Sequence, residues 1–396
     1  MRPKSGLPKR KALRRMPKFD FGMRHNPKVQ ELFNPALLSD QIRRKYSVLS
    51  MFSGCGGMDL GFLGGFRYLD TEFSSHPFRI LQAIDNDRLA IETYKLNIGD
   101  DAMVGDLTEI SAENLPKTRV LIGGFPCQDF SSSGPKVGFA GARGLLYLSM
   151  IGYMRHHRPD VVIGENVPHI ASLHKGIYLR KILEDIKAVG YNPAVWELFA
   201  PDFGISQSRR RIIIIATRAE IGFPPRQPIG EFTCKFRPIE FAIDDLKTVT
   251  DEQVPNQSQY FVATKATSGG GQGDHKNKKG ELAYCIRANA KARIQFHYDL
   301  ERRLTVRECA RIQSFPDEFV FPHSAMNNMT QIGNAVPPVL GWSVAKVIAE
   351  FLHNVDAGLF NEIPLKDAMG ISSTRIAKVL NGYQDETQQR LFSDAS

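Results

Sequence analysis

The stretch YSVLSMFSGCGGMDLGF, residues 46–62, decides the fold. Its first half is an apolar run of the length and composition of a buried β-strand. Three glycines, Gly54, Gly56 and Gly57, follow at once, where the chain turns toward an amphipathic stretch. Glycines at a strand-to-helix turn let the backbone approach a ligand closely. The stretch therefore predicts a strand, a ligand-binding turn and a helix, although such a turn would serve a nicotinamide dinucleotide equally well.

Outward from this unit, short β-branched runs alternate with longer amphipathic stretches. This alternation indicates βαβ units and an α/β fold with a parallel sheet. Ligands bind such an open sheet beyond the carboxyl ends of its strands, so the residues that follow each strand are the candidates for chemistry. We expect strands at 47–52, 80–85, 119–123, 160–164, 194–199 and 211–217.

Beyond residue 217 the pattern gives way to Pro-rich, Gly-rich and polar sequence, and regular structure resumes near Arg302. A disordered linker is one reading of this insert. Its aromatic residues, however, supply enough apolar area for a small folded lobe, so we favour a second, loop-rich domain. These residues are Phe232, Phe236, Phe241, Tyr260, Phe261, Tyr284 and Phe296.

The composition is that of an ordinary globular protein. The chain has 396 residues, 42% of them hydrophobic and 23% charged. Its longest apolar runs, such as 212–216, are far shorter than the roughly 18 residues of a membrane span, and its N-terminus has no apolar core of a secretory signal. We therefore expect a cytoplasmic protein without a membrane segment. The five cysteines show neither disulfide nor zinc spacing, so no metal site is expected.

The net charge of +9 is concentrated in one place. Residues 1–28 hold ten Lys and Arg against the single acid Asp20, which leaves 41 basic and 41 acidic residues in the remainder. This arm could neutralise DNA phosphates and add salt-dependent, sequence-independent affinity. A solvated terminus without a partner is the equally weighted alternative.

Two acids complete a nucleoside site around the glycine turn. Asp85 ends the second strand, where a carboxylate suits the hydroxyls of a ribose, and Asp106 follows the third region. The turn departs from the dinucleotide pattern GxGxxG, and no Arg is arranged for a pyrophosphate, so we favour adenosine without phosphates. The ring of Phe52 could then contact the sulfonium of S-adenosylmethionine by a cation-π interaction.

A thiol and a carboxyl follow two other strands. Cys127, in FPCQDFSSSG, and Glu165, in GENVP, are both expected at the carboxyl edge of the sheet. Addition of a thiolate to carbon 6 of cytosine makes carbon 5 nucleophilic, and a carboxyl group can hold the proton that ring N3 needs. Arg209 and Arg211, in QSRRR, could activate the thiol or contact the target base or a phosphate; a solvated strand entrance is the plain alternative.

Six motifs, FSGCGGMDLGF, GFPCQDFS, GENVP, QSRRR, RRLTVRECARIQSFPD and QIGNAVPP, occur in the order seen in DNA (cytosine-5) methyltransferases. The chain resembles this family over roughly residues 46–352. The resemblance implies a Rossmann-like S-adenosylmethionine-dependent fold with a target-recognition domain. It indicates a catalytic cofactor-binding domain (46–217), a recognition domain (218–299) and a return segment (300–355). The basic arm (1–45) and the tail (356–396), which we expect to be helical, lie outside the family's common core.

By the same resemblance, the catalytic residues are Cys127, Glu165, Arg209 and Arg211, and the product of the cofactor is S-adenosyl-L-homocysteine. The target cytosine would be flipped out of double-stranded DNA into the site. Asn86 stands where the family usually has an aromatic residue, so Asp87 is a further candidate. The cofactor-binding residues are expected to be Phe52, Gly54, Gly56, Gly57, Asp85, Asn86, Asp106, Leu107, Asn334 and Val336.

Three rival functions use the same fold. A transfer RNA cytosine methyltransferase would share the thiol and carboxyl, but the sizeable insert argues against it. A catalytically silent DNA-binding regulator would be expected to lack Cys127 or Glu165, and both are present. A nicotinamide oxidoreductase leaves the FPCQ and ENV pair unexplained. We expect a monomeric bacterial restriction-modification enzyme that protects DNA from a partner restriction endonuclease.

Overall fold

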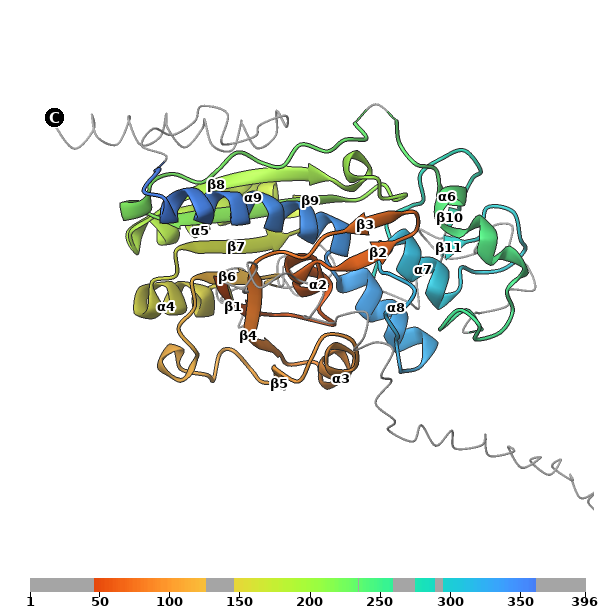
Figure 1. The fold of residues 1–396 in the computed structure, drawn as a ribbon, viewed down its shortest axis with the longest axis horizontal. Helices are drawn as coiled ribbons and strands as arrows, with labels where there is room; N and C mark the ends of the chain where they lie inside the picture. Colours follow the sequence, from red (N-terminus) through yellow and green to blue (C-terminus); the bar gives the residue numbers. More distant parts are fainter. Residues whose placement is uncertain (1–45, 126–145, 234, 259–274, 289–294, 361–396) are drawn as a thin grey trace, which may run out of the picture. The chain divides into compact units, whose positions relative to one another are not determined.

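A computed structural model describes residues 46–125, 146–233, 235–258, 275–288 and 295–360. The basic arm, the tail from residue 361, and Cys127, Tyr260 and Phe261 lie outside these ranges. A seven-stranded sheet runs through the described part in the order β5-β4-β1-β6-β7-β9-β8 (Figure 1). Its strands are β1 (Tyr46–Met51), β4 (Phe78–Asp85), β5 (Ala102–Val104), β6 (Val120–Gly123), β7 (Val161–Asn166), β8 (Tyr191–Phe199) and β9 (Arg210–Arg218).

The sheet departs from the expected parallel arrangement at β9, which runs antiparallel to both β7 and β8. Only residues 200–209 connect β8 to β9, and they hold the short 3₁₀ helix η8 (Ala200–Phe203). A parallel crossover needs a dozen or more residues, so this connection can only reverse the chain. As a result, β9 begins at the edge of the sheet where β7 ends, with Ile212 opposite Asn166.

An edge strand and a small hairpin in the described part of the chain were not expected from the sequence. The edge strand β5 is only three residues long, and β2 (Phe66–Tyr68) pairs with β3 (Thr71–Phe73) as a separate antiparallel hairpin. Both are too short to show a periodic pattern in the sequence. The six strands that the sequence predicted are present, with bounds that differ by a few residues.

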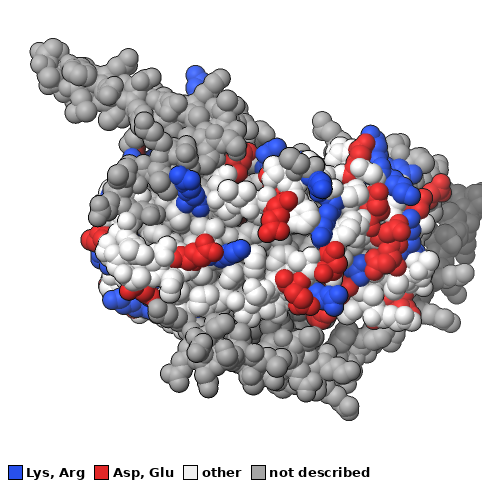
Figure 2. All heavy atoms as spheres, turned by 45° about the horizontal axis from the view of Figure 1, so that its top comes forward, with Lys and Arg blue, Asp and Glu red and all other residues white. Residues whose placement is uncertain are grey.

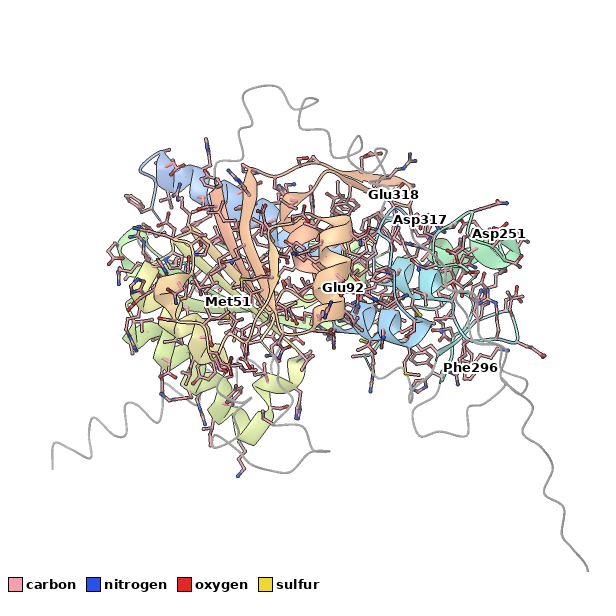
Figure 3. All side chains as sticks on the ribbon, turned by 90° about the horizontal axis from the view of Figure 1, so that it is seen from below. Met51, Glu92, Asp251, Phe296, Asp317 and Glu318 are labelled. Atoms are coloured by element: carbon pink, nitrogen blue, oxygen red, sulfur yellow. The ribbon has the colours of Figure 1, made fainter. Side chains whose placement is uncertain are left out.

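Helices cover both faces of the sheet. On one face, α4 (Tyr147–His157) and α5 (Ile177–Ala188) form one apolar cluster with buried strand residues such as Leu121 and Ile214. On the other face lies α9 (Pro338–Asp356), which packs against α2 (Gly57–Leu63) (Figure 3, in which Met51 of β1 is labelled). The helix α3 (Arg88–Asn97) lies beside β4 and β5.

One stretch of the described chain, Ala325–Asp356, is long and apolar enough to cross a membrane by length and composition. Within the fold, 61% of its most apolar window is buried. The stretch contains α8 (Ala325–Asn334) and α9. Its hydrophobicity is therefore explained by packing against the sheet and α2.

The segment after β9 is sparse in regular structure. Between residues 218 and 299, the described part contains η9 (Ala219–Ile221), α6 (Ile239–Ile243), η10 (Asp244–Thr248), β10 (His275–Lys276) and β11 (Gln295–Phe296). Of the aromatic residues expected to build a core here, Phe296 (labelled in Figure 3) is buried, whereas Phe236, Phe241 and Tyr284 are exposed.

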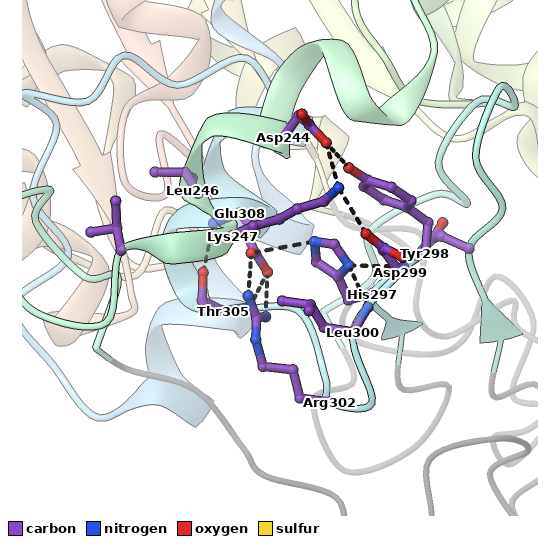
Figure 4. A network of polar contacts seen from close by, with 12 residues as sticks. Asp244, Leu246, Lys247, His297, Tyr298, Asp299, Leu300, Arg302, Thr305 and Glu308 are labelled. Carbon is purple, nitrogen blue, oxygen red and sulfur yellow. Dashed lines mark hydrogen bonds and ion pairs between the residues drawn. The ribbon is translucent and has the colours of Figure 1, made fainter.

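The core of this segment is instead shared with the return segment. The helix α6 packs on α7 (Val306–Ile312) and buries Ile239, Ala242 and Ile243. A polar network next to this contact joins η10 to the chain that leads into α7 (Figure 4). In it, Lys247 pairs with Asp299 at 2.8 Å, and Arg302 forms two hydrogen bonds to Glu308, the residue that closes the capping box of α7.

Candidate functional site

The glycine turn between β1 and α2 is held in left-handed backbone conformations. Phe52, Gly54 and Gly56 have φ angles of 55°, 54° and 89°. A non-glycine residue in this region costs about 1–3 kcal/mol and is typically found at functional sites. A Cβ added to Gly54 would meet no atom within 4 Å, so open space adjoins the backbone there. Phe52 is half-buried and packs against the α4–α5 cluster.

The carboxylate of Asp85 stands directly beside this turn. Its Oδ2 accepts a hydrogen bond from the backbone N–H of Gly54 at 2.8 Å, and its Oδ1 accepts one from Asp87 at 2.9 Å. Burial is the largest influence on Asp85 and raises the pKa of its carboxyl. The side chain thus fixes the glycine turn and brings a carboxylate to the end of β4.

Asp106 follows β5 at the same edge, because Gly105 donates to the backbone oxygen of Asp85 at 2.9 Å. Its Oδ1 accepts from the backbone and the hydroxyl of Thr108, and these bonds lower the pKa of its carboxyl. Leu107 is buried in the apolar cluster beneath. Asp85 and Asp106 are therefore brought together as the sequence predicted.

The two residues after Asp85 differ in role. Asn86 is exposed and is free to contribute to a ligand site. Asp87 is the N-cap of α3, with its Oδ1 accepting from Leu89 at 2.9 Å and Ala90 at 3.3 Å. This cap explains an acid at position 87 without a ligand.

The late segment QIGNAVPP returns to the glycine turn. A Cβ at Gly57 would lie 2.4 Å from the backbone oxygen of Val336, so the two backbones touch and only glycine fits. Val336 is buried, and Asn334, the last residue of α8, is exposed. The expected return of this segment to the cofactor side is thereby observed.

Glu165 and Arg211 form a buried ion pair at the carboxyl edge. The Nε of Arg211 lies 2.6 Å from Oε1 of Glu165, and the two side chains are 10% and 11% exposed. A Cβ at Gly124 would be 3.3 Å from Oε2 of Glu165, so the carboxylate sits against the chain that leaves β6. The pair exists because β9 is antiparallel, which brings its first residues to the end of β7.

Asn166 holds the last described residue before Cys127, which is Phe125. Its Nδ2 donates to the backbone oxygen of Phe125 at 2.9 Å, and its Oδ1 accepts from Val167. The Phe125 ring lies so close to Gly164 that a Cβ there would be 2.9 Å from it. Cys127 itself lies outside the described residues. The sequence signal for Asn166 was its place next to Glu165 at a strand end.

Arg209 corrects an expectation. We expected it to contact the thiol, the target base or a phosphate, but it is 1% exposed and donates to three backbone oxygens. Its partners are Ile286 at 2.8 Å, Gly333 at 3.0 Å and Ala335 at 2.8 Å. Burial lowers the pKa of the guanidinium to about 10. A buried cation needs hydrogen-bond acceptors. Backbone oxygens supply them to both terminal nitrogens of Arg209, whereas its Nε has no hydrogen-bond partner among the described residues.

Sequence reasoning missed two buried amides. Gln207 bridges Ile286, Gln313 and Ile312. Gln331 is 4% exposed, and neither its Oε1 nor its Nε2 has a hydrogen-bond partner within the described chain. The backbone oxygen of Gln331 lies 3.9 Å from the thiol of Cys55 in the glycine turn.

Among the described residues, no group of three or more His, Cys, Asp or Glu could hold a metal.

Comparisons with known proteins bear on the family of this chain. A family model described as C-5 cytosine-specific DNA methylase matches residues 46–285 and 247–350. The chain is 29% identical to Type II methyltransferase M.NgoFVII of Neisseria gonorrhoeae, over 86% of this chain and 96% of that protein. It is 31% identical to Type II methyltransferase M.BsuRI of Bacillus subtilis, over 78% and 80%.

Among solved structures, the S. pombe Dnmt2 methyltransferase is similar, with a TM-score of 0.59 and 20% identity over 79% of this chain and 100% of that one. At this identity the likeness concerns the fold alone. It confirms the expected α/β methyltransferase fold.

Proposed function

The chain belongs to the C-5 cytosine-specific DNA methylase family, and we propose that it transfers a methyl group from S-adenosyl-L-methionine to a cytosine flipped out of a specific duplex site. DNA cytosine-5 methylation itself follows from the family. The buried Glu165–Arg211 pair, held against Gly124 three residues before Cys127, is the observation that carries the mechanism.

The residues around the glycine turn fit the proposed cofactor. Gly54 borders open space, and Asp85 and Asp106 stand at one edge, where their carboxylates suit ribose hydroxyls and an adenine amine. The Ser53 hydroxyl and the Gln331 amide are buried and have no hydrogen-bond partner among the described residues, so a ligand would satisfy them. When bound, S-adenosylmethionine supplies an electrophilic methyl group. Phe52, Gly56, Gly57, Asn86, Leu107, Asn334 and Val336 complete the proposed binding set.

The chain's own residues prepare the cytosine. The thiolate of Cys127 bonds to carbon 6, while Glu165 holds the proton at ring N3 and Arg211 fixes the orientation of that carboxyl. Carbon 5 then takes the methyl group. That transfer would convert S-adenosyl-L-methionine to S-adenosyl-L-homocysteine. Loss of the carbon 5 proton to water and breakage of the bond between the Cys127 sulfur and carbon 6 then restore the aromatic ring and free the thiolate.

Two of the three described cysteines are poor nucleophiles. Cys55 and Cys309 are buried, and burial raises the pKa of both thiols, that of Cys55 to about 12. A thiolate is therefore disfavoured at either position. The burial of these two thiols supports Cys127 as the nucleophile.

We assign DNA recognition to the segment 218–299. Its described part 275–288 carries exposed Lys276, Lys278, Lys279 and Arg287, which suit phosphates and base edges. On the face in Figure 2, acidic side chains gather in one region, with Lys and Arg side chains among them. Exposed acids near α6 and α7 would repel a duplex: Asp244, Asp245, Asp251, Glu252 and Glu318.

Names of the relatives suggest the biological setting. M.NgoFVII and M.BsuRI are Type II methyltransferases, so we infer that this chain protects DNA from a partner restriction endonuclease. We propose that it acts as a monomer, because one chain carries every residue of the proposed site. A bacterial DNA substrate would place it in the cytoplasm.

The test uses the full chain and DNA carrying 5-fluorocytosine, since fluorine blocks the final elimination. Bisulfite sequencing of DNA from cells that express the chain first maps the modified cytosine. The wild type should form a denaturation-resistant adduct with a fluorinated duplex of that site, and Cys127→Ala should form none while still binding DNA. Methylation retained by Cys127→Ala would overturn the assignment. Transfer RNA, offered in parallel, should remain unmethylated.

A further inference from the structure

Arg209 joins three segments that are distant in sequence. It lies just before β9, and its guanidinium donates to Ile286, in the recognition segment, and to Gly333 and Ala335, in the segment that meets the glycine turn. All three bonds are 3.0 Å or shorter and are buried or part-buried. One side chain therefore holds the proposed DNA-reading chain and the proposed cofactor-binding chain at a fixed separation.

Gln207 reinforces the same connection. Its Oε1 accepts from the backbone of Ile286 at 2.9 Å, and its Nε2 donates to Gln313 at 2.7 Å. Gln313 in turn donates to the backbone oxygen of Ala335 at 2.6 Å. A second polar path thus runs from Ile286 to Ala335, parallel to that through Arg209.

The two joined segments also touch directly. A Cβ at Gly333 would lie 2.3 Å from the backbone nitrogen of Ala288, so no side chain fits between them. Thr330 donates to the backbone oxygen of Ala288 at 3.0 Å. Neither segment can shift by much without breaking buried hydrogen bonds or displacing the other. We call the set Gln207, Arg209, Ile286, Gln313, Gly333 and Ala335 the junction.

We propose that the junction couples DNA binding to cofactor binding, with Arg209 and Gln207 as positioning residues rather than catalytic ones. The inference rests on the proposed function, which gives segment 275–288 to DNA and segment 333–336 to the cofactor. Because the junction holds the two segments as one unit, a ligand that shifts one segment shifts the other with it, so the second ligand meets a site already adjusted. Because coupling free energies are reciprocal, each ligand tightens the other by the same factor.

The chain contains a matched control in Arg307. It is 0% exposed, and its guanidinium also donates to three backbone oxygens, those of Pro255, Pro316 and Phe319. Burial likewise lowers its pKa to about 10. None of its partners belongs to the junction. Arg307→Lys therefore removes comparable buried bonds without touching the proposed connection.

The experiment measures S-adenosyl-L-homocysteine binding to the full chain by calorimetry, with and without the duplex mapped by bisulfite sequencing. In the wild type, the duplex should lower the Kd by about fivefold or more. Arg209→Lys and Gln207→Met should bring this ratio close to one, whereas Arg307→Lys should keep it, even where thermal unfolding shows equal destabilisation. Gln207→Met keeps the test informative if Arg209→Lys does not fold.

The outcomes separate the two proposals. A wild type that binds both ligands with a ratio of one overturns the coupling and leaves the proposed function intact. So does a ratio unchanged by Arg209→Lys or Gln207→Met, or one that Arg307→Lys abolishes to the same degree. A wild type that binds neither ligand contradicts the proposed function itself.

Discussion

Three consecutive arginines have three different environments. Arg209 donates hydrogen bonds to backbone oxygens. Arg210 lies 4.0 Å over the ring of Phe199, and Arg211 pairs with Glu165. Alternation along a strand places Arg210 on the face opposite Arg211. Identical residues in one motif therefore cannot share one role, and we assign only Arg211 to the positioning of Glu165.

Replacing Arg211 should separate these roles. Arg211→Met removes the partner that orients Glu165, so single-turnover methylation should slow by about 10²–10³-fold, the loss typical of an electrostatic catalytic group. Arg210→Met is the matched control, because it removes an exposed neighbour from the other face, and its rate should stay within severalfold of the wild type. Equal losses in the two variants would contradict the assignment.

Asp59 predicts a pH dependence of stability. It is fully buried in α2, with Oδ1 accepting from Tyr94 at 3.1 Å and Oδ2 without a hydrogen bond within the described chain. Burial raises the pKa of its carboxyl to about 6. A pKa raised by folding means that the protonated form is favoured in the native state. The contribution of the protonated Asp59 carboxyl to folding stability is fully present below the pKa of the unfolded chain, and it is lost as pH rises toward 6.

Asp59→Asn should remove this dependence, because the amide stays neutral and still accepts from Tyr94. The pKa shift corresponds to about 3 kcal/mol at most. Relative to the wild type, the free energy of unfolding of the variant should therefore rise by up to that amount between about pH 4 and pH 7. Urea unfolding at several pH values measures it. Parallel stability curves for the two proteins would show that Asp59 does not titrate in this window.

At the scale of elements, α2 and α9 approach each other closely at a glycine, Gly61 of α2. A Cβ at Gly61 would lie 2.5 Å from the backbone nitrogen of Trp342 and 2.6 Å from the carbonyl carbon of Gly341. The close approach brings the glycine turn, at the start of α2, against the chain that enters α9. The crossing therefore helps to set the position of the proposed cofactor site.

Gly61→Ala should destabilise the protein by about 1–3 kcal/mol, since backbone atoms cannot move aside as a side chain would. Gly152→Ala is the matched control in α4, where an added Cβ meets nothing within 4 Å. It should stabilise the protein by about 0.5–1 kcal/mol, the helical preference of Ala over Gly. Thermal unfolding reads both, and equal signs would refute the packing argument.

At the scale of the whole molecule, the basic arm predicts a salt effect. Its ten Lys and Arg in residues 1–28 carry the entire net charge of +9. If they bind phosphates, changing them to Gln should flatten the slope of log K against log salt by about 0.9 for each phosphate that is no longer neutralised. DNA binding of full-length wild type and variant, measured between low and physiological salt, gives the two slopes. Identical slopes would mean that the arm does not touch DNA.

The loop-rich segment does not stand alone in this fold. Its helix α6, with buried Ile239 and Ile243, packs on α7, and Asn256 donates to the backbone oxygen of Phe321 at 2.7 Å. The sequence indicated that aromatic residues would build a local core. It could not show that the apolar partners come from residues 50 or more positions later, because contacts between distant segments leave no periodic trace.

The sequence by itself determined the order of features along the chain: a β-strand, a glycine turn, and acids, a thiol and Glu165 at successive strand ends. These are local patterns, because the periodicity of apolar side chains and the residue preferences of turns depend on neighbouring residues. Only the tertiary structure decided which arginine meets Glu165 and which is buried at the junction. The physical reason is the reversal of β9: strand direction depends on how the chain pairs in space, and it carries Arg211 to the edge where β7 ends.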